Sequence, residues 1–170
     1  MIYDSKPKKQ TIETINAMIE YFQGDAKRIH HFMKVYALAK TIAINEKLPS
    51  DMLYLLEITA VTHDIGVKLS EEKYGSADGK YQEQEGPAEA EKLLSELGFE
   101  EEFINKVCYL IANNHTYKGI DNKVHRILIE ADLLVNIYDD HISPELAKRV
   151  KQNIFRTESG IKMFDEMYGF

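Results

Sequence analysis

Apolar residues along this chain recur mainly at steps of three and four positions, the spacing of one face of an α-helix. The first stripe comprises Ile12, Ile15, Ile19 and Phe22. Gly24 ends this stripe, and Asp25 is a suitable N-cap for the next helix. The second stripe comprises Ile29, Phe32, Tyr36, Ala39 and Ala43. The pattern therefore predicts two amphipathic helices in succession.

A third helix is predicted to end at His63, with Ser50 or Asp51 as its cap. Because this segment is apolar on more than one side, we expect it to be buried at the centre of the fold. The periodicity then fails from Ile65 to Gly86, a glycine-rich and polar stretch. A connection of this length is typical of a lid or a binding loop.

The rest of the chain returns to the helical period. Pro87 suits the first turn of a helix that Gly98 ends. Further stripes predict helices at 103–115, 124–138, from Ser143-Pro144 onward, and 161–167. We find no segment with the period of a β-strand. The sequence thus predicts an all-α fold of about seven to eight helices in a single domain, 1–170, with its core at 25–140 and helices at 144–168 packed on it.

Composition narrows the class of protein. The chain has 170 residues and a net charge of -7, so a nucleic-acid polymer is not an expected partner. Cys108 is the only cysteine, which rules out an intrachain disulfide. The segment Met1–Gln10 lacks the apolar core of a secretion signal, and no apolar run is long enough for a membrane span. We expect a cytoplasmic protein that does not bind membranes. Residues near the C-terminus, such as Met167, could pack on the core or form a homodimer.

Four polar residues stand out on apolar helix faces: His31, the doublet His63-Asp64, and Asp132. A buried carboxylate needs a cation as partner, and no basic residue lies within one helical turn of Asp132. Taken singly, each residue could be a hydrogen-bonded core histidine, a cap or an ion-pair partner. Together, two imidazoles and two carboxylates on three helices form a mixed N/O ligand set for a divalent transition metal. Two other histidines, His125 and His141, are expected at the surface.

The order and context of these residues resemble the HD-domain superfamily of metal-dependent phosphohydrolases. The motifs are Arg28-Ile29-His30-His31, Val61-Thr62-His63-Asp64-Ile65-Gly66 and Glu130-Ala131-Asp132. The resemblance covers roughly residues 25–140. It implies that His31, His63, Asp64 and Asp132 bind a divalent metal ion (Mn, Fe, Co, Ni, Zn or Mg), one per chain.

The chain departs from the family pattern at three places. Gln82 stands where many members have a further histidine, and Asn114-His115 replaces a His-His pair. Fewer imidazoles favour one metal over two, although Glu83 or Glu85 could supply oxygen ligands. A frequent family lysine is Val67 here, with Lys68 one place later.

The resemblance also implies catalytic roles. Asp64 would bind metal and orient a water molecule, Arg28 would hold a phosphate, and His115 would bind or protonate the leaving oxygen. The alternatives are a surface salt bridge for Arg28 and an ordinary helix terminus for His115. Lys68, Lys80, Tyr117 and Lys118 are candidate substrate-binding residues; Lys80, Tyr117 and Lys118 lie in loops that could flank the site.

Three functions remain open at this stage. The first is hydrolysis of a phosphomonoester or phosphodiester of a small molecule, with nucleotides among the candidates. The second is di-iron oxygenase chemistry on the same fold. The third is a metal-binding regulatory module without catalysis, because a fold does not fix a function.

Overall fold

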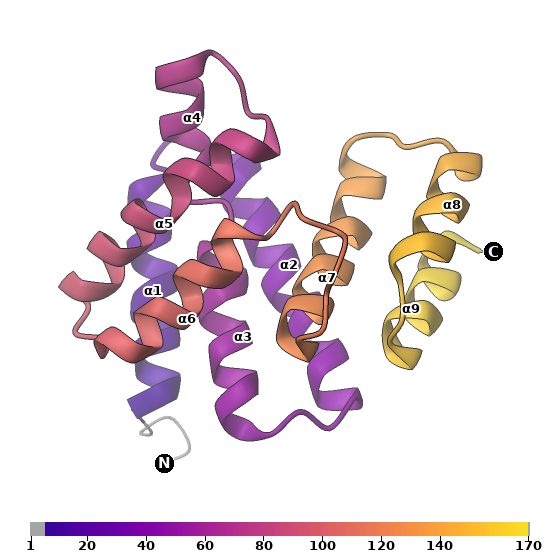
Figure 1. The fold of residues 1–170 in the computed structure, drawn as a ribbon, viewed down its shortest axis with the longest axis horizontal. Helices are drawn as coiled ribbons and strands as arrows, with labels where there is room; N and C mark the ends of the chain where they lie inside the picture. Colours follow the sequence, from indigo (N-terminus) through magenta and orange to yellow (C-terminus); the bar gives the residue numbers. More distant parts are fainter. Residues whose placement is uncertain (1–5, 170) are drawn as a thin grey trace.

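The computed structural model describes residues 6–169, so the first half of the Met1–Gln10 segment lies outside the described residues. Within that range the chain forms nine α-helices and no strand (Figure 1). The helices are α1 (Lys6–Tyr21), α2 (Ala26–Asn45), α3 (Ser50–Thr62), α4 (Val67–Tyr74), α5 (Gly79–Glu96), α6 (Glu101–Ala112), α7 (Lys123–Asp139), α8 (Pro144–Ile154) and α9 (Glu158–Tyr168). The all-α prediction is confirmed, with α4 as an additional helix.

Helix α3 lies at the centre of the bundle, in contact with α1, α2, α6 and α7 (Figure 1). Its two sides serve two apolar clusters: Leu56 and Ala60 pack with α2 and α7, whereas Ile58 and Val61 pack with α1 and α6. This explains why the α3 sequence is apolar on more than one side. The carboxyl end of α3, which carries His63 and Asp64, consequently meets its neighbours in the interior of the protein.

The expectation of a long loop at 65–86 is wrong, because α4 and the first half of α5 occupy it. Two glycines that suggested a loop instead permit close packing. A Cβ on Gly66 would lie 2.6 Å from the Gly86 nitrogen, and a Cβ on Gly86 would lie 2.7 Å from Ile111 Cγ2. Accordingly Pro87 lies inside α5 rather than in its first turn. Packing against α4 and α6 holds α5 together despite the hydrogen bond that a proline nitrogen cannot donate.

The predicted helix caps have mixed outcomes. Asp25 caps α2, accepting a hydrogen bond from the Arg28 backbone N–H at 3.2 Å, and Ser143 caps α8 in the same way. The prediction for α3 is wrong, since Pro49 precedes its first residue and no side chain caps it.

Helices α8 and α9 lie beside α7 at one side of the molecule (Figure 1). Ala147, Phe155 and Phe164 join the apolar cluster of α2, α3 and α7. The buried Glu130 of α7 accepts hydrogen bonds from the Arg156 N–H at 2.7 Å and the Thr157 N–H at 3.1 Å. The C-terminal helices are therefore packed on the core, while Met167 remains exposed. No helix within residues 6–169 combines the length and apolar character that crossing a membrane requires.

Candidate metal centre

The two histidines and two aspartates predicted as ligands come together where α2, α3 and α7 pack. The His31 Nε2 atom lies 3.1 Å from Asp64 Oδ2 and 3.1 Å from Asp132 Oδ1. The His63 Nε2 atom lies 3.4 Å from Asp64 Oδ1 and 3.3 Å from Asp132 Oδ1. The two Nε2 atoms are themselves 3.3 Å apart. Side chains from α2, from α7 and from the two residues that follow α3 thus meet in one cluster.

Hydrogen bonding fixes the orientation of the His63 ring. Its Nδ1 lies 2.7 Å from the Ala60 carbonyl oxygen, which accepts only if Nδ1 carries the proton. In the neutral ring the Nε2 lone pair then faces the cluster, as a metal ligand requires. The Nδ1 atom of His31 lies 3.9 Å from Asp139 Oδ2. A carboxylate outside the cluster therefore lies on the side of the His31 ring that faces away from the other ligands.

The cluster perturbs the titration of its own members. Burial alone would lower the pKa of the imidazoles, but contacts with Asp132 and Asp64 raise the pKa of His31 to about 9. The pKa of His63 is raised as well, mainly by Asp64 and Asp132. Burial would raise the pKa of the carboxyls, yet the two imidazoles lower that of Asp64, and lower the pKa of Asp132 to about 2. The two carboxylates therefore stabilise positive charge between them, carried by protonated imidazoles or by a bound cation.

The residues fit a divalent metal ion. Within residues 6–169 no donor with favourable hydrogen-bond geometry satisfies the buried Oδ1 of Asp132, although two imidazole nitrogens lie within 3.3 Å of it. An ion at the centre of the cluster would occupy this acceptor, and the same imidazole and carboxylate atoms would then serve as its ligands. His31, His63 and Asp64 can each offer one ligand atom within 4.8 Å of the others. Imidazole and carboxylate donors suit a divalent transition metal.

A pocket of about 380 Å³ opens over this cluster. Arg28 and His115, the residues predicted from sequence to act in catalysis, line this pocket together with Asp64. The walls also contain residues that the sequence analysis did not single out: Lys27, Asp78, Gly79, Asn136, Asp139 and Asp140. Asn136 and Asp139 follow Asp132 by four and seven positions on α7, so helical periodicity could have identified them.

Arg28 faces the pocket while engaged in two ion pairs. Its guanidinium contacts Asp25 Oδ2 at 2.7 Å and Glu71 Oε1 at 2.6 Å. Glu71 lies on α4, so the guanidinium joins α2 to the helix that the sequence did not predict. A phosphate at this position would compete with both carboxylates for the same guanidinium.

The candidate substrate-binding residues occupy different positions. Lys68 lies over the Tyr21 ring at 5.3 Å and Lys80 over the Tyr81 ring at 4.6 Å, and neither lines the pocket. Tyr117 does not line the pocket either, although burial and then the charges of Asp132 and Asp64 raise its pKa to about 12. Lys118 is exposed in the same loop.

Three other residues have roles that the sequence did not reveal. Glu83 Oε1 accepts a hydrogen bond from the His115 backbone N–H at 2.8 Å. The Glu85 carboxylate accepts hydrogen bonds from Lys73 Nζ and the Tyr74 hydroxyl. Both alternative oxygen ligands are therefore engaged away from the cluster. His125, expected at the surface, is buried with its Nε2 2.8 Å from the Asn113 carbonyl oxygen. This bond ties α7 to the end of α6.

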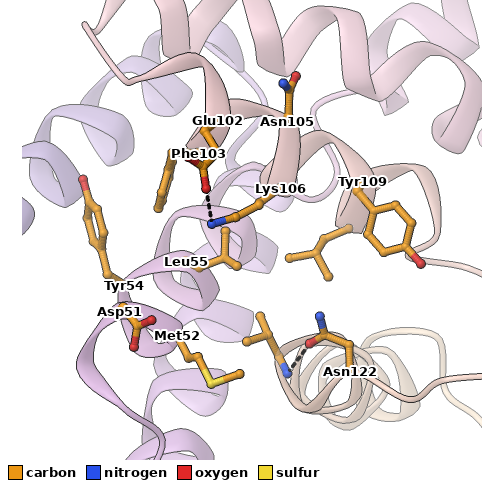
Figure 2. A pocket seen from close by; sticks show the side chains of 12 residues that line it. Asp51, Met52, Tyr54, Leu55, Glu102, Phe103, Asn105, Lys106, Tyr109 and Asn122 are labelled. Carbon is orange, nitrogen blue, oxygen red and sulfur yellow. Dashed lines mark hydrogen bonds and ion pairs between the residues drawn. The ribbon is translucent and has the colours of Figure 1, made fainter.

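A wider groove, of about 630 Å³, lies between α3, α6 and the start of α7 (Figure 2). Its lining is apolar around Leu55 and Phe103, and its charged members include Asp51 and the ion pair Glu102–Lys106. No imidazole lines it, and its acids do not converge on one point. The smaller pocket is therefore the candidate active site, because the histidines and the converging aspartates line it.

Comparisons with known proteins agree with this geometry. A family model described as HD domain matches residues 28–140. The chain also matches the crystal structure of a predicted HD superfamily hydrolase from an uncultured Thermotogales bacterium, with 30% sequence identity and a TM-score of 0.66. That match covers 94% of this chain and 85% of the other. No curated protein matches.

Proposed function

On the premise that this chain belongs to the HD-domain family, we propose that it is a metal-dependent phosphohydrolase. Its substrate would be a phosphomonoester or a phosphodiester of a small molecule, nucleotides included. The observation that carries the proposal is the pocket in which Asp64 and Arg28 lie beside the ligand cluster. A purely structural metal site is closed by its own ligands and by packed side chains. Here the Asp64 side chain is 23% exposed, so a substrate can reach it.

Each wall of the pocket suits a part of this reaction. A divalent cation held by His31, His63, Asp64 and Asp132 would supply Lewis-acid chemistry and lower the pKa of water. Arg28 and Lys27 provide the positive charge that holds phosphate oxygens. Asp64 accepts a hydrogen bond from the attacking water and orients it. His115 also lines the pocket and is our candidate for donating a proton to the leaving group.

The bond changes balance without a co-reactant. The water oxygen forms a bond to phosphorus, and the bond from phosphorus to the leaving oxygen breaks with its electron pair on that oxygen. Asp64 takes one proton from the attacking water, the leaving oxygen gains one from His115, and exchange with solvent returns both side chains to their starting states. The products are an alcohol and either inorganic phosphate or a phosphomonoester.

The test uses protein that has been stripped with a chelator and reconstituted with Mn²⁺, Fe²⁺, Co²⁺, Ni²⁺, Zn²⁺ or Mg²⁺. We expect roughly one metal ion per chain by mass spectrometry, and metal-dependent release of product from a panel of phosphate esters. Asp132→Ala and His31→Ala are expected to lose both the metal and the activity. Asp121→Asn, an exposed change in the loop before α7, serves as the matched control.

The other outcomes are equally specific. Two irons per chain with oxygen consumption would replace the proposal by oxygenase chemistry, and the absence of any metal would favour a structural role for the cluster. Metal retained in full by both alanine variants would contradict the ligand assignment itself.

A further inference from the structure

Tyr138, near the end of α7, has the most exposed large hydrophobic side chain within residues 6–169, at 71%. Met167, at 46%, is exposed on α9, a helix that packs against both α7 and α2. Exposed apolar groups that gather on one face of a protein indicate a contact surface for another molecule. Neither side chain lines the pocket over the metal centre, so their exposure calls for a separate explanation.

Tyr138 stands at the edge of a groove made of two adjoining hollows. The first has a volume of about 280 Å³ and lies between α2, α7 and α9. Its apolar walls comprise Tyr138, Ala37, Leu38, Leu134, Val135 and Met167. The second, of about 220 Å³, lies between the first half of α2 and the end of α7. Lys34, Tyr138 and Asp139 line both hollows, so the two are continuous, and we call them together the α2–α7 groove.

The first hollow suits an apolar side chain rather than a polar ligand. The charged residues that line it, Lys34 and Asp139, are paired with each other, because Lys34 Nζ lies 2.6 Å from Asp139 Oδ1 and 2.7 Å from Oδ2. Sites for small ligands place a few polar groups where these orient the ligand. Here those groups are already engaged, so the occupant is expected to bind by apolar packing.

A second copy of this chain can supply that side chain. In an interface with two-fold symmetry the same surface of both copies meets, so each copy must carry a projection and a matching recess. The α2–α7 groove has both side by side, since the exposed Tyr138 ring lies next to the apolar hollow. Tyrosine is also among the residues that contribute most to binding at protein interfaces.

Charges along the groove are complementary in the same sense. The α2 side of the second hollow carries Lys27, His30 and Lys34. The α7 side carries Asp139, which the exposed Asp140 follows. Within residues 6–169 neither Lys27 nor Asp140 forms an ion pair. A two-fold copy presents both signs of charge, whereas a partner of one sign would leave half of the groove unmatched.

We propose that the α2–α7 groove is the interface of a homodimer with two-fold symmetry, in which Tyr138 of each copy occupies the apolar hollow of the other. Lys27 and Asp139 line the pocket over the metal centre as well as the groove. The second copy therefore lies at the entrance to that pocket. The dimer does not depend on the proposed hydrolase reaction and is tested without it.

The experiment is sedimentation equilibrium of the metal-reconstituted full chain over a range of concentrations. We expect the mass of two chains at the upper end of the range. The dissociation constant should be about 10 µM or lower, because specific interfaces of ordinary size reach this affinity.

Two variants remove the proposed fit. Tyr138→Asp replaces the projecting ring, and Ala37→Glu places a carboxylate in the hollow; both positions are exposed, so the fold should be retained. Each should raise the dissociation constant at least about 100-fold, because the symmetry repeats the change in both copies. Tyr138→Phe, which keeps the ring, should still dimerise. Tyr109→Asp, a change at another exposed tyrosine in the wider groove, is the matched control and should dimerise like the unaltered chain.

The mass of a single chain at the highest concentration would overturn the dimer. A dimer that persists in Tyr138→Asp, or one that dissociates in Tyr109→Asp, would also overturn the proposal, because the contact would then lie on another face. Circular dichroism checks that each variant is folded. If Ala37→Glu unfolds, Tyr138→Asp decides the question.

Discussion

His31 combines two demands that oppose each other in the metal-free protein. Its pKa of about 9 means that the imidazole is protonated at neutral pH, whereas a metal ligand must offer a lone pair. In an unfolded chain the imidazole has its ordinary pKa of 6.5. Its contribution to stability is therefore complete below about pH 6.5 and is lost as the pH rises through about 9.

This leads to a prediction about proton release. Metal added to the chelated protein at pH 7 should displace protons from the cluster, and the apparent metal affinity should increase with pH up to about 9. Calorimetry of Zn²⁺ binding in buffers of different ionisation enthalpy measures the number released. His141→Gln, a change at an exposed histidine, is the control and should release the same number. Metal binding without proton release at pH 7 would show that the imidazoles are neutral beforehand.

Arg28 gives a second prediction at this scale, because its guanidinium is shared between Asp25 and Glu71. Glu71→Gln should leave the Arg28 guanidinium with one carboxylate partner fewer. The affinity for a phosphonate ligand should then rise about two- to fivefold, which corresponds to the free energy of a partly exposed ion pair. Glu72→Gln, the neighbouring exposed change on α4, should have no such effect. Unchanged affinity in Glu71→Gln would argue that Arg28 does not contact the anion.

Among single residues, the four candidate ligands could be singled out from sequence because buried charge without a partner is rare. The structure confirms that their side chains meet. His125 shows the limit of this approach. It was expected at the surface, yet its acceptor is a backbone carbonyl of another segment, and such carbonyls are invisible in a sequence pattern.

At the scale of helices, glycine positions were the main source of error. Gly66 and Gly86 resemble loop residues in sequence, but they allow α5 to approach the turn after Asp64 and the side of α6. Periodicity cannot distinguish a glycine that breaks a helix from one that permits two segments to touch. The same ambiguity moved the predicted start of α5 to Pro87.

The contact at Gly86 predicts a measurable cost. Gly86→Ala adds a methyl group 2.7 Å from Ile111 Cγ2, and we expect a loss of about 1–3 kcal/mol in the free energy of unfolding despite the better helix propensity of alanine. Urea denaturation measures this. The double variant Gly86→Ala with Ile111→Leu, which removes Cγ2 from its present position, should recover part of the loss. Gly86→Ala as stable as the unaltered chain would mean that α6 can move away freely.

At the scale of the whole molecule, Glu130 joins the C-terminal helices to the core. Its carboxylate accepts two backbone N–H bonds, from Arg156 and Thr157, and one from the Thr157 hydroxyl at 2.5 Å. Burial raises its pKa although these hydrogen bonds act to lower it. A Cβ on Gly160 would overlap Glu130 Oε2, so a larger residue at position 160 would displace this carboxylate from its donors.

Glu130→Ala should therefore lower the free energy of unfolding by about 2–4 kcal/mol, since it leaves buried donors without an acceptor. Glu145→Ala, an exposed change in α8, should stay within about 0.5 kcal/mol of the unaltered chain. Metal content should be unchanged in folded Glu130→Ala, because this side chain is not in the ligand cluster. A small loss of stability would show that α8 and α9 are held by apolar packing alone.

The sequence alone determined the helical class, the central position of the helix ending at His63, and the four candidate ligands, because each depends on local spacing and on the cost of burying charge. Only the tertiary structure decided what surrounds them. The carboxylate of α4 that holds Arg28, the close approach of Gly79 to His115, and the course of residues 65–86 all arise from contacts between separate segments of the chain. Such contacts depend on how helices pack, which the spacing of residues within one helix does not specify.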